Sequence, residues 1–246
     1  MHTPTADELL QAWESGLDQG PARRAVGLLA CACGAAPEQL AQLPVGVRDA
    51  RLFRLRRLLF GERIAALAQC PACAEQLDVA CSIDDICPHA ADTVADSVQP
   101  ELQVAAGAWR ISCRLPNSAD LIALTQRDAA PSPAALLRSC VLHAECDGKT
   151  VAFELVPQDA LDAVSSAMAS ADPLAQIELS LRCPACGHGW EDLLDIGAFL
   201  WKEVDAWARR TLHDVHTLAR AYGWSEADIL GLRASRRNIY LDMVRL

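Results

Sequence analysis

The chain of 246 residues lacks the sequence features of membrane proteins, secreted proteins and general nucleic-acid binders. No apolar run approaches the roughly 18 residues of a membrane-spanning helix. Residues 1–8 lack the basic and apolar regions of a signal peptide. The net charge is −10, an acidic balance that disfavours binding to nucleic-acid phosphates and anionic lipids. We therefore expect a cytoplasmic protein that binds neither nucleic acid nor membrane.

The common catalytic motifs are missing as well. The sequence contains no Gly-rich phosphate loop, no nucleophile elbow and no Ser/His/Asp set. The carboxylates are scattered, and no spacing singles out an acid/base pair. The sequence therefore predicts a protein that is not an enzyme and has no small-molecule substrate.

Cysteine, in contrast, is abundant. The chain has 11 cysteines, an odd number, and no secretion signal, which disfavours a disulfide framework. Four of them form two copies of Cys-Pro-Ala-Cys, at 70–73 and 183–186. In each copy a short polar turn and an apolar run follow. Four thiolates in two such knuckles are what a tetrahedral Zn²⁺ ion needs.

The two knuckles together predict a split zinc ribbon with the ligands Cys70, Cys73, Cys183 and Cys186. Because 109 residues separate Cys73 from Cys183, the ion would be a structural staple that closes a large loop. Four cysteine ligands leave no open position on the metal, so no metal-activated water is implied. It stays open whether another residue replaces one of the knuckle cysteines as a ligand; the candidates are Cys81, Cys87, His89 and His188.

Two other functions are alternatives for these knuckles. Cys-Pro-x-Cys also occurs in dithiol oxidoreductases, but redox motifs open a helix after a strand, whereas these motifs precede strands. A zinc-ribbon nucleic-acid or regulatory module needs basic residues around the knuckles. The flanks are acidic instead (Glu75, Asp78, Glu191, Asp192 and Asp195).

Hydrophobic periodicity and capping signals predict an α+β fold. Thr5 and Glu8 form a capping-box pattern, and a long helix over 199–222 ends at Gly223. We also expect a helix over 134–142 and a last helix capped by Ser235. The predicted units are a helical region (1–69), a split ribbon (70–87 and 183–196), an α+β insertion (88–182) and a C-terminal helical region (197–246).

Two surfaces are candidates for contact with a partner protein. A predicted helix over 47–60 carries Arg51 and Arg54 three residues apart, which indicates either a solvated face or a docking surface for an acidic partner. Near the C-terminus, Tyr222 and Trp224 flank the glycine stop, and Ile229 follows on a short helix. These residues either form a surface for a partner protein or pack the last two helices onto the long one.

Three stretches resemble proteins of the T-even-type phage baseplate and tail assembly family. They are His216-x-x-Ala219-x-x-Tyr222-x-Trp224-Ser225 through Ile229-Leu230 with the following Arg236-Arg237; Leu43-Pro44-Val45-Gly46-x-Arg48-Asp49 through Phe60-Gly61; and Arg114-Leu115-Pro116-Asn117-Ser118-x-Asp120-Leu121. The resemblance implies a non-enzymatic assembly factor or minor baseplate component of a contractile phage tail or tail-like injection system. It also implies other tail and baseplate proteins as partners, and association with a virion or tail-like particle.

Overall fold

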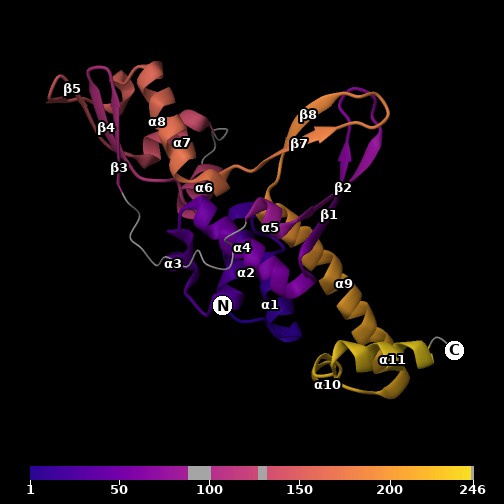
Figure 1. Ribbon diagram of the computed structural model, residues 1–246. Coiled ribbons are helices and arrows are strands. Elements are labelled where there is room, and N and C mark those ends of the chain that lie inside the picture. The colour runs from indigo at the N-terminus through magenta and orange to yellow at the C-terminus, as the bar shows by residue number, and fades with distance from the viewer. Residues whose placement is uncertain (88–100, 127–131, 245–246) are drawn as a thin grey trace.

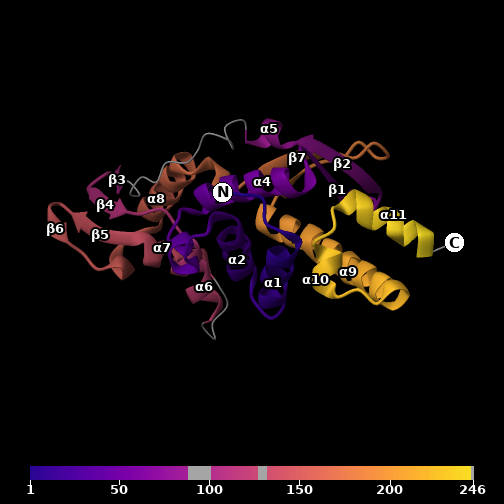
Figure 2. The same ribbon diagram turned by 90° about the horizontal axis from the view of Figure 1, so that it is seen from below.

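The computed structural model describes residues 1–87, 101–126 and 132–244, in which a helical body carries three projecting parts (Figure 1). These parts are a pair of β-hairpins, an α+β insertion and a helical corner at the C-terminus. Seen after a quarter turn, the insertion and the corner lie at opposite ends of the body (Figure 2). The mixture of helices and small antiparallel sheets confirms the predicted α+β class.

The helical body contains α1 (Ala6–Gly16), α2 (Pro21–Cys33), α3 (Pro37–Ala41), α4 (Val45–Phe60) and the first half of α9 (Ile196–Tyr222). The predicted capping box begins α1, because Thr5 Oγ1 accepts from the Glu8 amide (3.2 Å) and Glu8 Oε2 accepts from the Thr5 amide (2.7 Å). At the end of α4, Gly61 adopts a φ of 88°, which costs glycine no steric strain.

The body has the largest apolar core of the described chain. Leu29, Leu52, Phe53, Leu200 and Val204 are all fully buried in it. Burying a side chain of this size stabilises a fold by about 1.5–3 kcal/mol. Since α9 is separated from α4 by more than a hundred residues of sequence, its packing here closes the chain on itself.

Two β-hairpins form the part that we call the hairpin arm, residues 63–82 and 178–193. The first consists of β1 (Arg63–Gln69) and β2 (Gln76–Ser82), and short α5 (Ile83–Ile86) follows; the second consists of β7 (Glu178–Arg182) and β8 (Gly189–Leu193). Every second residue along β1, β2 and β7 is at least half-buried, as expected where two hairpins face one another. The arm is anchored at its base, because Ile64 and Ile196 belong to the body core.

The insertion combines a four-stranded antiparallel sheet with helices. Its elements are β3 (Leu102–Ala106), β4 (Trp109–Cys113), α6 (Ser118–Thr125), α7 (Pro133–Cys140), β5 (Val141–Cys146), β6 (Lys149–Thr150), η1 (Phe153–Leu155), α8 (Gln158–Ala171) and η2 (Pro173–Ala175). A second core, with Ile111, Cys140 and Val164 fully buried, lies between the sheet and α8. The helix predicted over 134–142 is too long, because Val141 already pairs with Cys113 in the sheet.

The C-terminal corner consists of the end of α9, α10 (Glu226–Leu230) and α11 (Ala234–Val244). Gly223 ends α9 in the left-handed conformation, as predicted (φ 68°). A third core of Leu218, Ile229 and Leu241 holds the corner together. The prediction that Ser235 caps the last helix is wrong, because α11 starts at Ala234 and includes Ser235.

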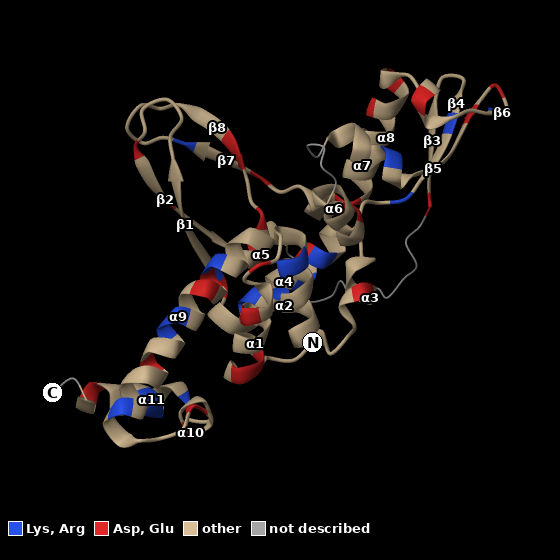
Figure 3. Cartoon of the chain, turned by 180° about the vertical axis from the view of Figure 1, so that it is seen from behind, with Lys and Arg blue, Asp and Glu red and all other residues tan. Residues whose placement is uncertain are grey.

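Charge is distributed unevenly over these parts. Lysines and arginines gather on α4, α9 and α11, whereas acidic residues are spread over the body, the arm, the insertion and the corner (Figure 3). Neither α9 nor another helix in the described ranges combines the length and apolar character needed to cross a membrane. The division into four units stays a prediction.

Candidate metal centre

The first Cys-Pro-Ala-Cys repeat forms the turn at the tip of the β1–β2 hairpin. Gln69 pairs with Gln76 as the last rung of the ladder. Beyond it, the Cys70 amide donates to the Glu75 carbonyl (2.9 Å), and the Ala74 amide donates to the Cys70 carbonyl (2.9 Å). Ala74 adopts a φ of 62°, an uncommon conformation for a residue with a Cβ. These bonds curl the tip so that both cysteines lie on one side of it.

The second repeat builds the same turn at the tip of the β7–β8 hairpin. The Cys183 amide donates to the His188 carbonyl (2.8 Å), and the Gly187 amide donates to the Cys183 carbonyl (3.0 Å). Gly187 occupies the position of Ala74 and has a φ of 76°. The sequence repeat is therefore a repeat of backbone geometry, with glycine at the left-handed position in one copy only.

The two tips meet and bring all four sulfurs into one cluster. The Sγ atoms of Cys70, Cys73, Cys183 and Cys186 all lie within 4.8 Å of one another. Across the two hairpins, Cys70 Sγ lies 3.7 Å from Cys186 Sγ, and Cys73 Sγ lies 3.6 Å from Cys183 Sγ. In a tetrahedral site with Zn–S bonds of about 2.3 Å, the sulfurs stand about 3.8 Å apart. The cross-hairpin spacing therefore suits a single four-coordinate ion.

Burial and hydrogen bonding divide the cluster into an inner and an outer half. Cys70 and Cys183 are buried, whereas Cys73 and Cys186 face solvent. Burial raises the pKa of Cys70, but the amides of Ala72 and Cys73 and the nearby thiols donate to its sulfur and bring the pKa to about 7. The Glu75 amide lowers the pKa of Cys73, yet the crowded sulfurs raise it to about 12. Four thiolates at this distance repel one another, and a bound cation would remove that repulsion.

The cluster has the donor set of a structural metal site. Thiolate sulfur is a soft ligand that favours zinc, copper(I) or iron–sulfur clusters over magnesium or calcium. An ion held by all four sulfurs has no open position for water or substrate. Such an arrangement can cross-link the two hairpins but cannot activate a nucleophile at the metal.

The substitute ligands considered from the sequence do not join the cluster where they are described. Cys81 lies half-buried within β2, and Cys87 is buried in the body core. The exposed His188 stacks on Trp190, with ring centroids 6.2 Å apart. His89 lies outside the described residues. Within the described chain, the cluster therefore consists of the four knuckle cysteines alone.

The predicted partner residues near the C-terminus lie together, but not all of them reach the surface. Tyr222 stacks on Trp224 with ring centroids 4.7 Å apart, and both contact Tyr240 edge to face. Tyr222 is exposed and Trp224 is half-buried. Ile229 is fully buried in the core of the corner, so its side chain supports the aromatic cluster from inside instead of contacting a partner. The partner role of Tyr222 and Trp224 stays a prediction.

The arginines of α4 differ in their exposure and partners. Arg51 and Arg54 are half-buried, and their role in partner contact stays a prediction. Arg56 is buried and binds both carboxylate oxygens of Glu203 on α9 (2.9 and 3.0 Å). Arg57 forms ion pairs with Glu62 and Asp84. Of these four arginines, Arg56 therefore serves an internal contact with α9, and Arg57 pairs with carboxylates of the segments that follow α4.

Sequence reasoning missed a buried polar junction between the body and the insertion. The Val45 amide donates to the Pro116 carbonyl (3.0 Å), and Arg48 Nη1 donates to Ser118 Oγ (3.1 Å). The Gly46 amide donates to Asp172 Oδ2 (2.8 Å). The stretches 43–49 and 114–121, which carry two of the sequence resemblances, thus contact each other. In the sequence, the resemblance of both stretches to the same family was the one feature that linked them.

The comparisons with known proteins agree with the sequence resemblance. The family model described as "T4 bacteriophage base plate protein" matches residues 8–201. This range contains the four cysteines and both stretches of the junction, whereas the C-terminal corner lies beyond it. No significant match was found among the curated proteins or among the solved structures.

Proposed function

Because the chain belongs to the T4 bacteriophage base plate protein family, we propose that it is a non-enzymatic assembly factor or minor structural component of the baseplate of a contractile, phage tail-like particle. The family match over residues 8–201 carries this proposal. The sulfur cluster supports the non-enzymatic part, since an ion bound there has no open position.

The metal that we propose is Zn²⁺, with Cys70, Cys73, Cys183 and Cys186 as its ligands. When bound, the ion supplies a cross-link and no reaction. The chain's own residues do the rest: the knuckle amides hold the sulfurs in place, and the body anchors both hairpins at Ile64 and Ile196. The consequence is a rigid arm that projects from the helical body and presents a fixed surface to neighbouring subunits (Figure 1).

We propose other tail or baseplate proteins as the partners, which places the chain in the cytoplasm during assembly or on the finished particle. Tyr222 and Trp224 offer aromatic surface of the kind enriched at protein interfaces. Arg51 and Arg54 offer positive charge on α4. These four side chains lie apart from the metal centre, so a partner can be tested at each surface separately.

The test combines metal analysis with particle assembly. Purified protein should contain one zinc ion per chain by inductively coupled plasma mass spectrometry. Cys73→Ser should lose it, whereas Cys146→Ser, a half-buried cysteine outside the cluster, should keep it. In cells that lack the native copy, Cys73→Ser should reduce the number of complete baseplates counted by electron microscopy, and Cys146→Ser should not. Normal baseplates in a deletion strain would refute the assembly role.

The same preparation separates the alternatives. Stoichiometric zinc with thiols that do not react with a disulfide reagent excludes a dithiol oxidoreductase. Metal-free protein with one fast-reacting cysteine would support it instead. Binding of DNA or RNA at low salt would favour the nucleic-acid module, and we expect none because the arm is acidic.

A further inference from the structure

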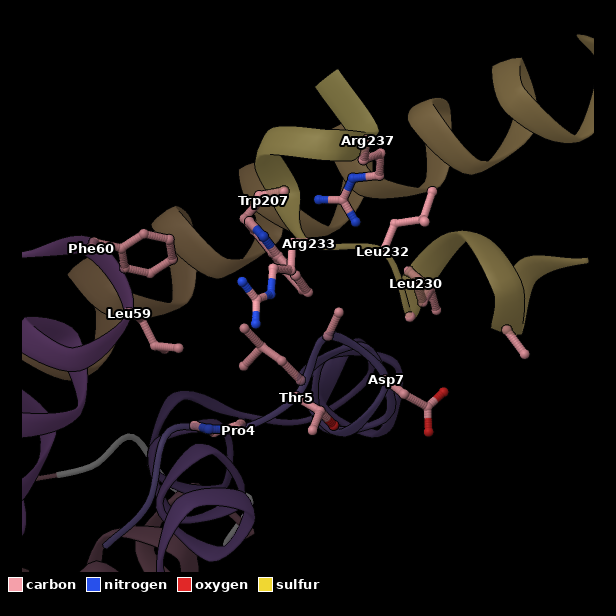
Figure 4. A pocket seen from close by; sticks show the side chains of 15 residues that line it. Pro4, Thr5, Asp7, Leu59, Phe60, Trp207, Leu230, Leu232, Arg233 and Arg237 are labelled. Carbon is pink, nitrogen blue, oxygen red and sulfur yellow. The ribbon is translucent and has the colours of Figure 1, made fainter. Parts of the chain in front are cut away.

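We propose that the groove between α1, the end of α4 and the α10–α11 connection binds an acidic, apolar peptide segment of a partner protein. We call it the Arg233 groove; its volume is about 740 Å³ (Figure 4). The groove is lined by Pro4, Thr5, Ala6, Asp7, Leu9, Leu59, Phe60, Trp207, Ala227, Leu230, Gly231, Leu232, Arg233, Ala234 and Arg237. The proposal rests on the proposed function, since it names the chemistry of one partner, but it does not involve the metal centre.

Apolar side chains form the walls of the Arg233 groove. Leu59, Trp207 and Leu232 come from three different elements and are each half-buried. Half-buried leucine and tryptophan side chains around a hollow lose contact with water when a large apolar side chain enters. The walls therefore favour a ligand that carries at least one large aliphatic or aromatic residue.

Two arginines supply the polar part of the groove. Arg237, in the first turn of α11, is only 9% exposed, and its Nε has no hydrogen-bond partner within the described chain. The nearest carboxylate oxygen, from Asp214, lies 3.8 Å from this Nε, which is too far for a hydrogen bond. The Arg237 Nε is itself enclosed, so a carboxylate in the groove would gain from the positive charge of this guanidinium group and not from a hydrogen bond to Nε.

Arg233 lies directly before α11 and is exposed. It forms no ion pair with another described residue, and Figure 4 shows it extending toward the space between Leu59 and the start of α1. Asp7 is the one carboxylate among the lining residues. It accepts a hydrogen bond from Gln11 (2.8 Å) and points away from the arginines in Figure 4. Among the residues that line the groove, neither guanidinium group therefore has a carboxylate partner; Arg237 forms its ion pair with Asp214, which does not line the groove.

The charges explain why the ligand should be a peptide carboxylate. The chain as a whole has a net charge of −10, so the two arginines that line the groove are a local exception to its acidic character. A ligand that binds beside them should therefore carry negative charge. Arginine binds a carboxylate through two parallel hydrogen bonds, and the adjacent apolar walls accept the neighbouring side chain. An Asp or Glu next to Leu, Phe or Trp meets both requirements.

The experiment uses the full-length, metal-loaded protein and a random 12-residue peptide library displayed on phage. We expect the selected peptides to carry Asp or Glu beside a large apolar residue. By fluorescence anisotropy, Glu→Gln in such a peptide and Arg233→Gln in the protein should each weaken binding about tenfold. The matched control, Arg236→Gln, alters an exposed arginine outside the groove and should change the affinity less than about twofold.

Several outcomes would overturn the proposal. They are a selection that yields no binder, binders without an acidic residue, and binding that Arg233→Gln leaves unchanged. Displacement of the peptide by 10 mM inorganic phosphate or by a single-stranded oligonucleotide would also overturn it, because the site would then be a general anion site. Arg233 is exposed, so its substitution tests the groove without a folding defect.

Baseplate assembly distinguishes this proposal from the proposed function. If Arg233→Gln weakens peptide binding about tenfold while the deletion strain still builds normal baseplates, the assembly role fails and the groove proposal stands. If assembly requires the protein but no acidic peptide binds, only the groove proposal fails.

Discussion

Loss of the zinc ion that we propose should loosen the hairpin arm and leave the helical body folded. Between Cys73 and Cys183 lie 109 residues, and closing a loop of that length costs about 5 kcal/mol of entropy in an unfolded chain. In the folded protein the body core already fixes both ends of the arm, because Ile64 and Ile196 are buried in it. A metal bound by the four cysteines would therefore govern a local equilibrium, the opening of the hairpin arm.

The weak stability of the two hairpins determines how strongly the arm depends on the metal. A two-stranded hairpin is at best marginally stable alone, and the facing residues of these two are only half-buried. We expect removal of the metal to lower the opening free energy of the arm by about 3–4 kcal/mol, which is two to three orders of magnitude in exchange protection. Cys73 is exposed, so Cys73→Ser removes a ligand without creating a cavity.

Hydrogen–deuterium exchange measured by mass spectrometry tests this prediction. Amides of β1, β2, β7 and β8 should exchange faster in Cys73→Ser and in chelator-treated protein, whereas α2 and α4 should change less than about threefold. Cys146→Ser controls for the loss of a thiol as such. The reasoning fails if the arm exchanges equally with and without metal, or if α2 and α4 lose protection together with it.

Two further predictions concern the junction between body and insertion. Gly46→Ala should destabilise the protein by about 2–4 kcal/mol in urea unfolding, because its Cβ would lie 1.9 Å from Asp172 Oδ1 and 2.9 Å from the Ala175 amide; Gly27→Ala, with nothing within 4 Å, should be neutral or slightly stabilising. Burial raises the pKa of Asp120, but hydrogen bonds from Arg114 outweigh it and hold the pKa below its ordinary value. The stability that Asp120 contributes is therefore present above about pH 4 and is lost as the pH falls through its lowered pKa. Asp120→Asn should remove this part of the acid dependence, and equal unfolding midpoints for both proteins across pH 3–6 would contradict it.

The sequence alone determined the features that depend on neighbouring residues. The capping box at Thr5, the glycine stops at Gly61 and Gly223 and the two knuckle turns are set by side chains within a few positions, so their structures were predictable. The grouping of the four cysteines was predictable for another reason: a tetrahedral metal ion takes four sulfur ligands, and the repeated Cys-Pro-Ala-Cys motif supplies four sulfurs, which lie within 4.8 Å of one another. Their role as metal ligands stays a prediction.

Only the tertiary structure decided which side chains are accessible and which distant segments meet. The arginines of α4 have the spacing of an exposed stripe, yet Arg56 is buried against Glu203, some 150 positions away. Ile229 follows two aromatic residues in an apparent surface motif, yet it lies in a core formed with Leu218 and Leu241. The Arg233 groove likewise draws its walls from α1, α4, α9 and the α10–α11 connection. Burial and long-range contact depend on the packing of whole elements, and no local pattern in the sequence records that packing.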